Sequence, residues 1–289
     1  MDEAKPAPAR PSTLRAVWQR FARKKVALVA LLLVGAQILV AVFAPLIAPH
    51  DPLHGDYAHT WEKPGRLFLL GTDDLGRDVL SRIIYGARMS LSIGILSQLI
   101  AATVGLPLGA LAAMTGRWVD YLIMRVIDVL SSLPSLLFYI ILMIVLGSGF
   151  WNIILAMSIT GWVGYARLVR GQVLSLKETD YVRAARSMGA GTRYIMGKHL
   201  VRNALSPVIV SFTLGIPGAM FAEAGLSLLG IGISPPTPSW GQMIGMYMNY
   251  IYTAPYLTLV PALVLAFSML CWILIGDNLR DAIDPTVRM

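Results

Sequence analysis

The sequence predicts an all-α membrane protein with six transmembrane helices. Hydrophobic residues make up 56% of its 289 residues and charged residues only 14%, whereas an ordinary soluble domain is about 25% charged. The mean hydropathy is +0.65. Six separate runs are apolar enough to cross a hydrocarbon core of about 30 Å, which takes roughly 20 residues of helix. Water therefore cannot be the only solvent around this chain.

The sequence divides into three parts. Residues 1–25 are expected to be cytoplasmic, with a disordered leader over 1–13 and an amphipathic helix over 14–25. A membrane domain follows over 26–276, and residues 277–289 form a cytoplasmic tail. The first span begins too far from the N terminus, and is too long, for a cleaved signal peptide. The six predicted spans cover residues 26–47, 89–114, 121–146, 150–166, 208–231 and 257–275.

Three longer polar segments separate some of these spans. The outward segment 48–88 is long for a loop and mixes Pro, Gly, Trp and charge, which predicts partial structure. The segment 167–206 is basic. The outward segment 232–256 contains aromatic residues that could receive a partner or anchor at the membrane interface, and anchoring is the favoured interpretation: Trp240, Tyr247, Tyr250, Tyr252 and Tyr256.

The distribution of Lys and Arg predicts the orientation, because these residues are retained on the cytoplasmic side. Residues 1–25 carry seven, position 117 one, residues 167–202 eight and the tail two, eighteen in all. Residues 48–88 carry five, balanced by six Asp or Glu, and residues 232–257 carry none. Both termini and the segment 167–206 are therefore expected in the cytoplasm. The basic residues flank spans, so the net charge of +8 indicates anionic lipid headgroups and not nucleic acid.

Several residues inside the spans need a physical reason. Gly105 and Gly109 have the spacing that permits close helix contact, and Pro107 between them is expected to bend the second span. Interior helix contact and a pathway-lining role explain this pattern equally well. Arg125 and Asp128 stand at i and i+3 on one helix face, where we expect them to satisfy each other.

Glu223 is the most costly isolated charge in the predicted spans, at about 3 kcal/mol on insertion scales. One interpretation places it by a translocation pathway, where it would attract the amino group of a peptide. The favoured interpretation is a structural hydrogen bond to a neighbouring helix.

The segment Asp180–Gly189 is the most informative part of the chain for function. A short helix with adjacent Ala184 and Ala185 and a following Gly189 presents a flat surface that a partner can approach closely. This segment resembles the cytoplasmic coupling loop of ABC-importer permeases. Arg183 replaces the Glu of that family's general pattern, and residues 199–202 replace its Ile-x-Leu-Pro, which narrows the resemblance to the peptide and nickel importer branch.

Four further blocks resemble the second permease subunit of dipeptide and oligopeptide importers: residues 70–82, 223–230, 235–241 and 276–285. The resemblance implies the type I ABC importer permease fold, with a cytoplasmic coupling helix in a bacterial inner membrane. It also implies a second homologous permease subunit, two ABC ATPase subunits that use ATP and Mg, and an extracytoplasmic substrate-binding protein that delivers peptide. The ATPase-coupling residues it implies are Tyr181, Ala184, Ala185, Met188 and Gly189.

The alternatives left open fall into two classes. Within the same class, the solute would be nickel, glutathione or another small molecule. In a different class, the chain would be a channel or a membrane receptor whose basic loop serves as a gating or signalling surface. Such a protein would need neither ATPase partners nor a second permease.

Catalytic interpretations are disfavoured. Residues 191–199 have five residues between the two glycines, and His199 stands where a phosphate-binding loop has the Ser or Thr that holds magnesium. Loop histidines without a fixed scaffold are usually solvated, so no metal site is expected among His50, His54 and His59. We expect a non-catalytic subunit that itself holds no cofactor or metal.

Overall fold

The computed structural model describes residues 14–283, so the predicted leader over 1–13 and residues 284–289 of the tail lie outside the described residues. Helices dominate, and no β-strand forms within this range beyond one isolated bridge between Thr72 and Asp78. The elements are α1 (Leu14–Arg23), α2 (Lys25–Val42), α3 (Ala44–Ile47), η1 (Tyr57–His59), α4 (Val79–Met114), α5 (Arg117–Ser131), α6 (Ser135–Leu146), α7 (Phe150–Lys177), α8 (Asp180–Ser187), α9 (Thr192–Ile195), η2 (Met196–Val201), α10 (Arg202–Leu228), α11 (Trp240–Tyr247), η3 (Met248–Tyr250) and α12 (Tyr256–Ile283).

Five single helices within the described residues are long and apolar enough to cross a membrane: α2, α4, α7, α10 and α12. The third predicted span, over 121–146, is a bent pair in which α5 and α6 meet at an angle of 85°. The predicted span 121–146 therefore consists of two helices joined at a break and not of one continuous helix. Pro134, with an extended ψ of 129°, precedes α6, and a proline interrupts a helix because it lacks an N–H and restricts the residue before it.

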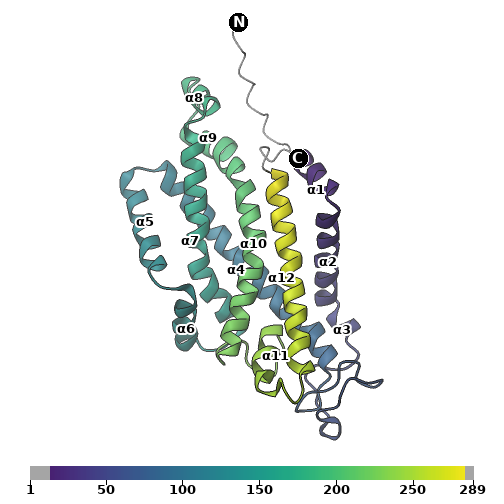
Figure 1. Ribbon diagram of the computed structural model, residues 1–289. Helices are drawn as coiled ribbons and strands as arrows, with labels where there is room; N and C mark the ends of the chain where they lie inside the picture. Colours follow the sequence, from purple (N-terminus) through teal and green to yellow (C-terminus); the bar gives the residue numbers. More distant parts are fainter. Residues whose placement is uncertain (1–13, 284–289) are drawn as a thin grey trace.

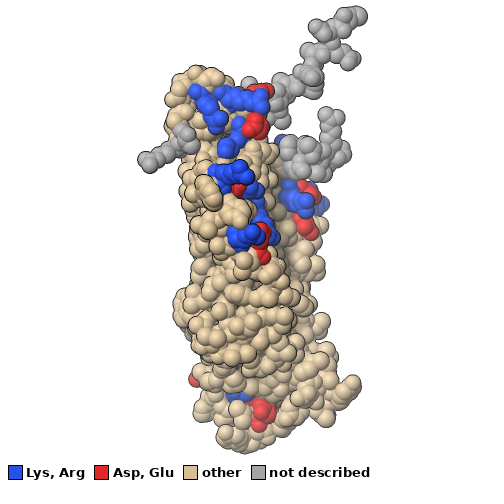
Figure 2. Space-filling view, turned by 90° about the vertical axis from the view of Figure 1, so that its left-hand side faces the viewer, with Lys and Arg blue, Asp and Glu red and all other residues tan. Residues whose placement is uncertain are grey.

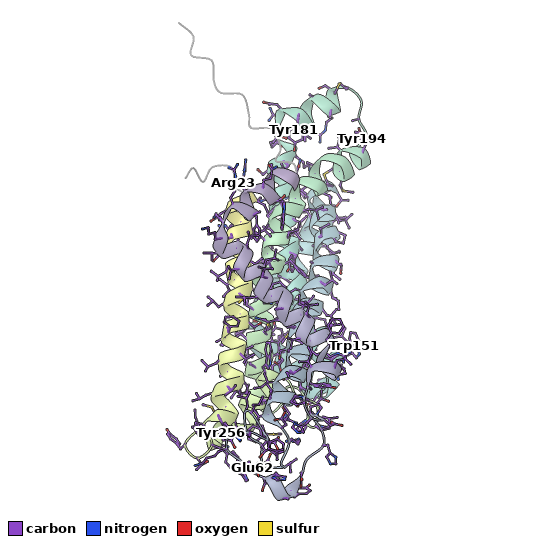
Figure 3. All side chains as sticks on the ribbon, turned by 90° about the vertical axis from the view of Figure 1, so that its right-hand side faces the viewer. Arg23, Glu62, Trp151, Tyr181, Tyr194 and Tyr256 are labelled. Carbon is purple, nitrogen blue, oxygen red and sulfur yellow. The ribbon has the colours of Figure 1, made fainter. Side chains whose placement is uncertain are left out.

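The long helices lie side by side with both described ends of the chain at the same end of the bundle (Figure 1). Helices α1, α8 and α9 and the end of α12 gather there, while α11 and the loops before α4 lie at the opposite end. Arg23, Tyr181 and Tyr194 lie at the first of these ends, and Glu62 and Tyr256 lie at the opposite end (Figure 3). The sequence predicts the same separation, with the segment 167–206 at one end of the bundle and the segments 48–88 and 232–256 at the other.

Close contact between α4 and α7 explains the glycines of the second span. A Cβ added at Gly105 would lie 2.5 Å from the carbonyl oxygen of Trp162, and one at Gly109 would lie 2.4 Å from that of Ala166. Real Cβ atoms do not approach backbone so closely, so only glycine fits at either position. Of the two explanations left open by the sequence, interior helix contact is the one that these distances support.

The expected pairing of Arg125 with Asp128 is wrong. Arg125 Nη2 donates to the hydroxyl of Tyr121 at 3.1 Å, because helical side chains lean toward the N terminus and meet the residue one turn back. Asp128 instead accepts from Arg167 Nη2 on α7 at 3.4 Å. The two charges therefore belong to different contacts, and one of them ties α5 to α7.

Helix α1 rests on the end of α12. Phe21 is buried, Lys24 Nζ lies 2.7 Å from Asp281 Oδ2, and Arg20 Nη1 donates to the carbonyl of Ala282 at 3.4 Å. A basic residue near the last carbonyls of a helix also interacts favourably with its dipole. These contacts hold the first described helix against the last.

Candidate functional site

Helix α8 is formed by a short stretch of sequence between two bundle helices. Helix α7 ends at Lys177, and Thr179 takes an extended conformation with φ −75° and ψ 148°. Asp180 begins the helix, where a negative charge complements the positive end of the helix dipole. The chain therefore starts a new eight-residue helix at the end of the bundle, as the coupling segment of the sequence predicts.

Two apolar side chains anchor α8 to the bundle. Val182 is fully buried and Ala185 is 8% exposed. Val182 belongs to the same buried cluster as Val173 of α7, Ile195 of α9 and Leu200 of η2. Fully burying a valine contributes about 1.5–3 kcal/mol. A displacement of α8 consequently acts on α7, α9 and η2 through this cluster.

Four of the five expected coupling residues are exposed, and three of these carry side chains that face outward. Tyr181 is 43% exposed, Met188 is 82% exposed, and Ala184 is exposed between them. Positions i, i+3 and i+7 share one face of a helix, so we call Tyr181, Ala184 and Met188 the outer face of α8. Asn203 Nδ2 of α10 donates to the Tyr181 hydroxyl at 3.1 Å and holds that ring against the bundle.

Ala185 and Gly189 occupy different environments. Ala185 faces the protein itself, so its small size suits the contact of α8 with the bundle and not an external surface. Gly189 has a φ of +84° and ends the helix: its N–H bonds the carbonyl of Arg186, and the N–H of Ala190 bonds that of Ala185, both at 3.0 Å. This is the Schellman arrangement, which favours glycine. The roles of both residues in ATPase coupling stay predictions.

The helix after the coupling segment continues without a break into the bundle. Residues 192–195 are α-helical, 196–201 are π-helical, and α10 runs on to Leu228. Short π-helical segments are rare and frequently occur at functional sites. One continuous helical path therefore links the neighbourhood of α8 to the far end of the protein.

Charged side chains gather near the α8 end of the molecule. Figure 2 shows Lys and Arg concentrated at that end and extending partway down the face of α5 and α7, above a band without charge. The exposed pair of Arg183 and Glu178, at 3.1 Å, lies beside α8. An uncharged band bounded by a basic end fits a chain embedded in a bilayer.

A buried polar cluster at the opposite end was not foreseen from the sequence. Asp73, fully buried, accepts from Arg77 Nε at 2.7 Å and from the backbone N–H groups of Leu75 and Arg77 at 2.9 and 3.0 Å. Arg82, also fully buried, lies 3.5 Å from Asp73 and donates to the carbonyl of Pro52. The sequence feature that could have predicted this cluster is the presence of three carboxylates and two arginines within residues 73–82, which is more charge than a segment that only flanks a membrane span needs. We call Asp73, Arg77 and Arg82 the outward clamp.

The outward clamp reaches α11 through Tyr247, which is buried. Arg77 Nη2 donates to the Tyr247 hydroxyl at 3.2 Å, and this hydroxyl donates to Asp74 at 2.6 Å. Burial disfavours the charged form of Arg77, yet Asp73 and Tyr247 together raise the pKa of Arg77 above its ordinary value. Burial also raises the pKa of Tyr247, so this phenol stays protonated as a donor.

Two aromatic residues predicted at the membrane interface are buried instead. Trp240 is 1% exposed, and its Nε1 donates to the carbonyl of Ile83 at 3.0 Å, while Tyr247 is also 1% exposed. Their polar atoms found partners inside the protein, which removes the reason for an interfacial position. Tyr252, by contrast, is 96% exposed.

Glu223 connects α10 to the start of α11. Its side chain is fully buried, and Oε1 accepts from the hydroxyls of Ser227 at 2.9 Å and Ser239 at 2.7 Å. Ser239 in turn accepts from the backbone N–H of Gln242 and caps α11. No described residue hydrogen-bonds Oε2. This geometry favours the structural interpretation of Glu223 over one facing a pathway.

Two of the three histidines of the outward segment, His50 and His59, lie in separate pairs. His59 Nδ1 lies 2.6 Å from Glu62, and this hydrogen bond raises the pKa of His59. His50 lies 3.6 Å from Asp78. Among the side chains that the structure describes, no three of His, Cys, Asp or Glu are grouped to hold a metal ion.

Comparison with known proteins identifies relatives along almost the whole chain. Residues 105–289 match the family described as binding-protein-dependent transport system inner membrane component, and residues 12–64 match the N-terminal TM domain of oligopeptide transport permease C. The di/tripeptide transport system permease protein DppC of Pseudomonas aeruginosa is 42% identical over 284 residues, covering 96% of this chain and 94% of the relative. The oligopeptide transport system permease protein OppC of Bacillus subtilis is 40% identical over 269 residues, covering 93% and 88%.

A third relative and a solved structure extend the comparison. The glutathione transport system permease protein GsiD of Pectobacterium atrosepticum is 39% identical, covering 95% of this chain and 91% of the relative. An inward-facing structure of the MetNI methionine ABC transporter aligns with a TM-score of 0.59 at 19% identity, covering 70% of this chain and 96% of that chain. The structural likeness shows the fold alone.

Proposed function

Because the chain belongs to the family of binding-protein-dependent transport system inner membrane components, we propose that it forms half of the translocation pathway of an ATP-driven importer for di- or oligopeptides. The chain is a multi-pass subunit of the inner membrane and a non-catalytic member of its transport system. The other half of the pathway is a second, homologous permease subunit.

The observation that carries the peptide assignment is the identity of 40–42% with two peptide permeases over more than nine-tenths of this chain. The glutathione permease relative at 39% supports glutathione as the second candidate solute. Membership of a transport family removes the support for a receptor. It also disfavours a channel, which would need no binding protein.

Energy enters through partner subunits in this proposal. Two ABC ATPases close on ATP and Mg and push on the outer face of α8. The buried contacts of Val182 pass this movement to α7, α9 and η2. The continuous helix from residue 192 to Leu228 carries it to Glu223 and Ser239 at the other end. There an extracytoplasmic binding protein delivers the peptide.

The orientation is part of the proposal. The excess of Lys and Arg over residues 1–25 and 167–202 supports a cytoplasmic position for α1, α8 and both termini. The outward clamp and α11 then face the side from which peptide arrives.

Reconstitution tests this function directly. The chain is coexpressed with the permease, ATPase and binding-protein genes encoded beside it, purified as an assembly and placed in proteoliposomes. Labelled dipeptide is expected to accumulate only with ATP and Mg, and excess unlabelled dipeptide is expected to compete better than glutathione. Accumulation of glutathione without peptide uptake would replace the peptide assignment with the glutathione one. A stable homo-oligomer that conducts solute without ATP would contradict an importer.

A further inference from the structure

The open face between α5 and α7 differs from the other exposed faces of the bundle. Helices α2 and α12 expose apolar side chains along their lengths, among them Leu32, Leu39, Leu263 and Phe267. Helices α5 and α7 expose charged pairs within apolar spans. Charged groups inside membrane spans are costly in lipid and almost always face water or other protein. The face of α5 and α7 therefore does not face lipid.

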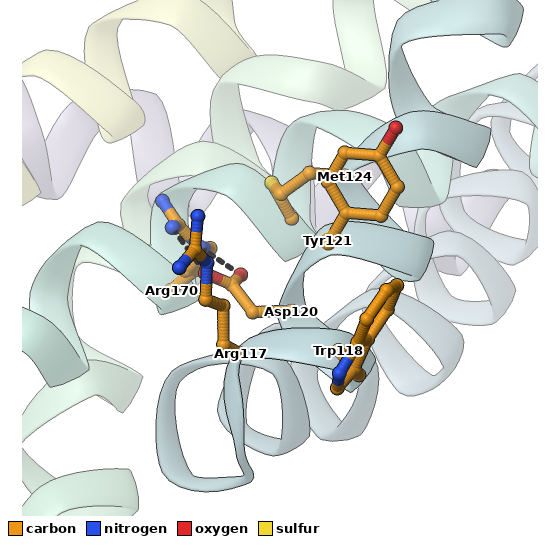
Figure 4. A pocket seen from close by; sticks show the side chains of 6 residues that line it. All are labelled: Arg117, Trp118, Asp120, Tyr121, Met124 and Arg170. Atoms are coloured by element: carbon orange, nitrogen blue, oxygen red, sulfur yellow. Dashed lines mark hydrogen bonds and ion pairs between the residues drawn. The ribbon is translucent and has the colours of Figure 1, made fainter.

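A cavity of about 730 Å³ lies where α5 meets α7. Figure 4 shows its lining, with an ion pair on one side and aromatic side chains on the other. Asp120 accepts from Arg170 in a two-pronged contact, at 2.5 Å from Nε and 2.6 Å from Nη2. The lining residues are Arg117, Trp118, Asp120, Tyr121, Met124 and Arg170.

A second ion pair extends the polar face deeper into the bundle. Asp128 and Arg167 are paired at 3.4 Å, yet their side chains remain 62% and 47% exposed. Asp128 stands eleven residues beyond the start of α5, roughly 16 Å along a helix with a rise of about 1.5 Å per residue. These charges lie too far from the helix end to belong to the polar residues that ordinarily flank a span at the membrane interface.

Small and polar residues continue this polar face along α7. Thr160, Gly164, Arg167 and Gly171 stand at i, i+4, i+7 and i+11, which places them on one helix face. A Cβ added at Gly164 or Gly171 would meet no described atom within 4 Å. Unlike Gly105 and Gly109, these glycines do not serve helix contact within this chain. Below them, Thr160 Oγ1 lies 3.2 Å from the Tyr139 hydroxyl of α6.

We propose that this face is the inner vestibule of the translocation pathway, and that Asp120–Arg170 and Asp128–Arg167 are exchangeable partners for the charged ends of a passing peptide. The proposal rests on the proposed import function. A free peptide carries an ammonium group and a carboxylate, so a wall with paired charges of both signs offers each end a counter-ion. Because the four charges of these two ion pairs already have partners, neither end of the peptide is held tightly enough to stop release.

Thiol labelling tests whether the face of α5 and α7 is accessible to water. Gly164→Cys is compared with Leu263→Cys, a variant at an exposed apolar position of α12, both in a Cys271→Ser background of the full assembly. A charged thiol reagent added from the cytoplasmic side is expected to modify Gly164→Cys at least about tenfold faster, because apolar surroundings raise a thiol pKa and one unit removes tenfold of thiolate. Equal, slow labelling would show a dry face against the second permease and overturn the proposal.

Charge variants test whether the ion pairs meet the substrate. Arg167→Gln is expected to lower uptake of an acidic dipeptide relative to a basic one, and Asp128→Asn is expected to change this ratio in the opposite direction. A merely structural role would change uptake of both dipeptides alike, and that outcome counts against the proposal. Uptake by the native assembly is measured first, so that a failure of peptide import is assigned to the proposed function and not to the vestibule.

Discussion

The outward clamp provides a sharp test of the structural reasoning, because neighbouring carboxylates have very different surroundings. The Asp73 side chain is 1% exposed, while that of Asp74 is 39% exposed. Both approach Arg77, at 2.7 Å and 3.7 Å respectively. Replacing each by asparagine removes one negative charge and changes the volume little. The variants Asp73→Asn and Asp74→Asn are therefore a matched pair.

The two variants are expected to lose different amounts of unfolding free energy, because Asp73 is buried and Asp74 is partly exposed. Asp73→Asn leaves two buried guanidinium groups, of Arg77 and Arg82, without their main counter-ion, and breaking a buried ion pair costs about 3–5 kcal/mol. Asp74→Asn removes a partly exposed pair, which is worth about 1 kcal/mol or less. The amide oxygen of asparagine can still accept the hydrogen bond that Tyr247 donates. The difference between the variants is therefore at least about 2 kcal/mol.

Detergent-induced unfolding of the purified chain measures both free energies of unfolding. Limited proteolysis within residues 48–78 reports local opening of the outward segment. We expect Asp73→Asn to unfold at a lower denaturant concentration and to be cleaved faster, with Asp74→Asn close to the native chain. Equal effects of the two substitutions would refute the assignment of Asp73 as the buried centre of the clamp.

Three further predictions concern other parts of the molecule. Glu223→Gln keeps an oxygen for both serine hydroxyls, so peptide uptake is expected to stay near normal; a large, selective loss for peptides would instead assign Glu223 to the pathway. Single cysteines at Thr192 and Ser234, in a background without the native cysteine, are expected to react from opposite sides of the membrane, and reaction of both from outside would reverse the orientation. His59 has a raised pKa in the folded protein, so its contact with Glu62 stabilises below the ordinary value of 6.5 and is lost as pH rises through the raised value. NMR titration is expected to show Glu62→Gln returning the pKa of His59 toward 6.5, and an unchanged pKa would contradict this cause.

Hydropathy was sufficient to predict the crossing segments, because a helix in lipid must satisfy its backbone internally and be apolar over its length. It could not predict the bend between α5 and α6. Apolar residues stand on both sides of the short segment 131–135 that contains Pro134, and prolines inside α10 and α12 do not end those helices. Neighbouring helices decide whether a proline breaks a span, and sequence alone does not contain those neighbours.

The candidate sites show the same limit. The resemblance indicated Tyr181, Ala184 and Met188 as coupling residues, and in the structure helical periodicity brings these three to one exposed face of α8. Spacing could not distinguish Ala185, which faces the bundle, or predict that Asp128 pairs with Arg167 thirty-nine residues away. The outward clamp was visible as a block of sequence, but its burial depends on α11, which follows it by more than 150 residues.

Transmission of ATPase movement through the outer face of α8 is the central claim, and Ala184→Trp tests it most directly. Ala184 is exposed, so a tryptophan there adds bulk toward a partner without entering the core of this chain, and Ala184→Ser is the matched small control. In proteoliposomes containing the whole assembly, we expect Ala184→Trp to abolish ATP-driven peptide uptake and weaken ATPase retention while the chain remains inserted at normal abundance. Ala184→Ser is expected to import normally. Peptide uptake at the native rate by Ala184→Trp, with its ATPases retained, would contradict the account.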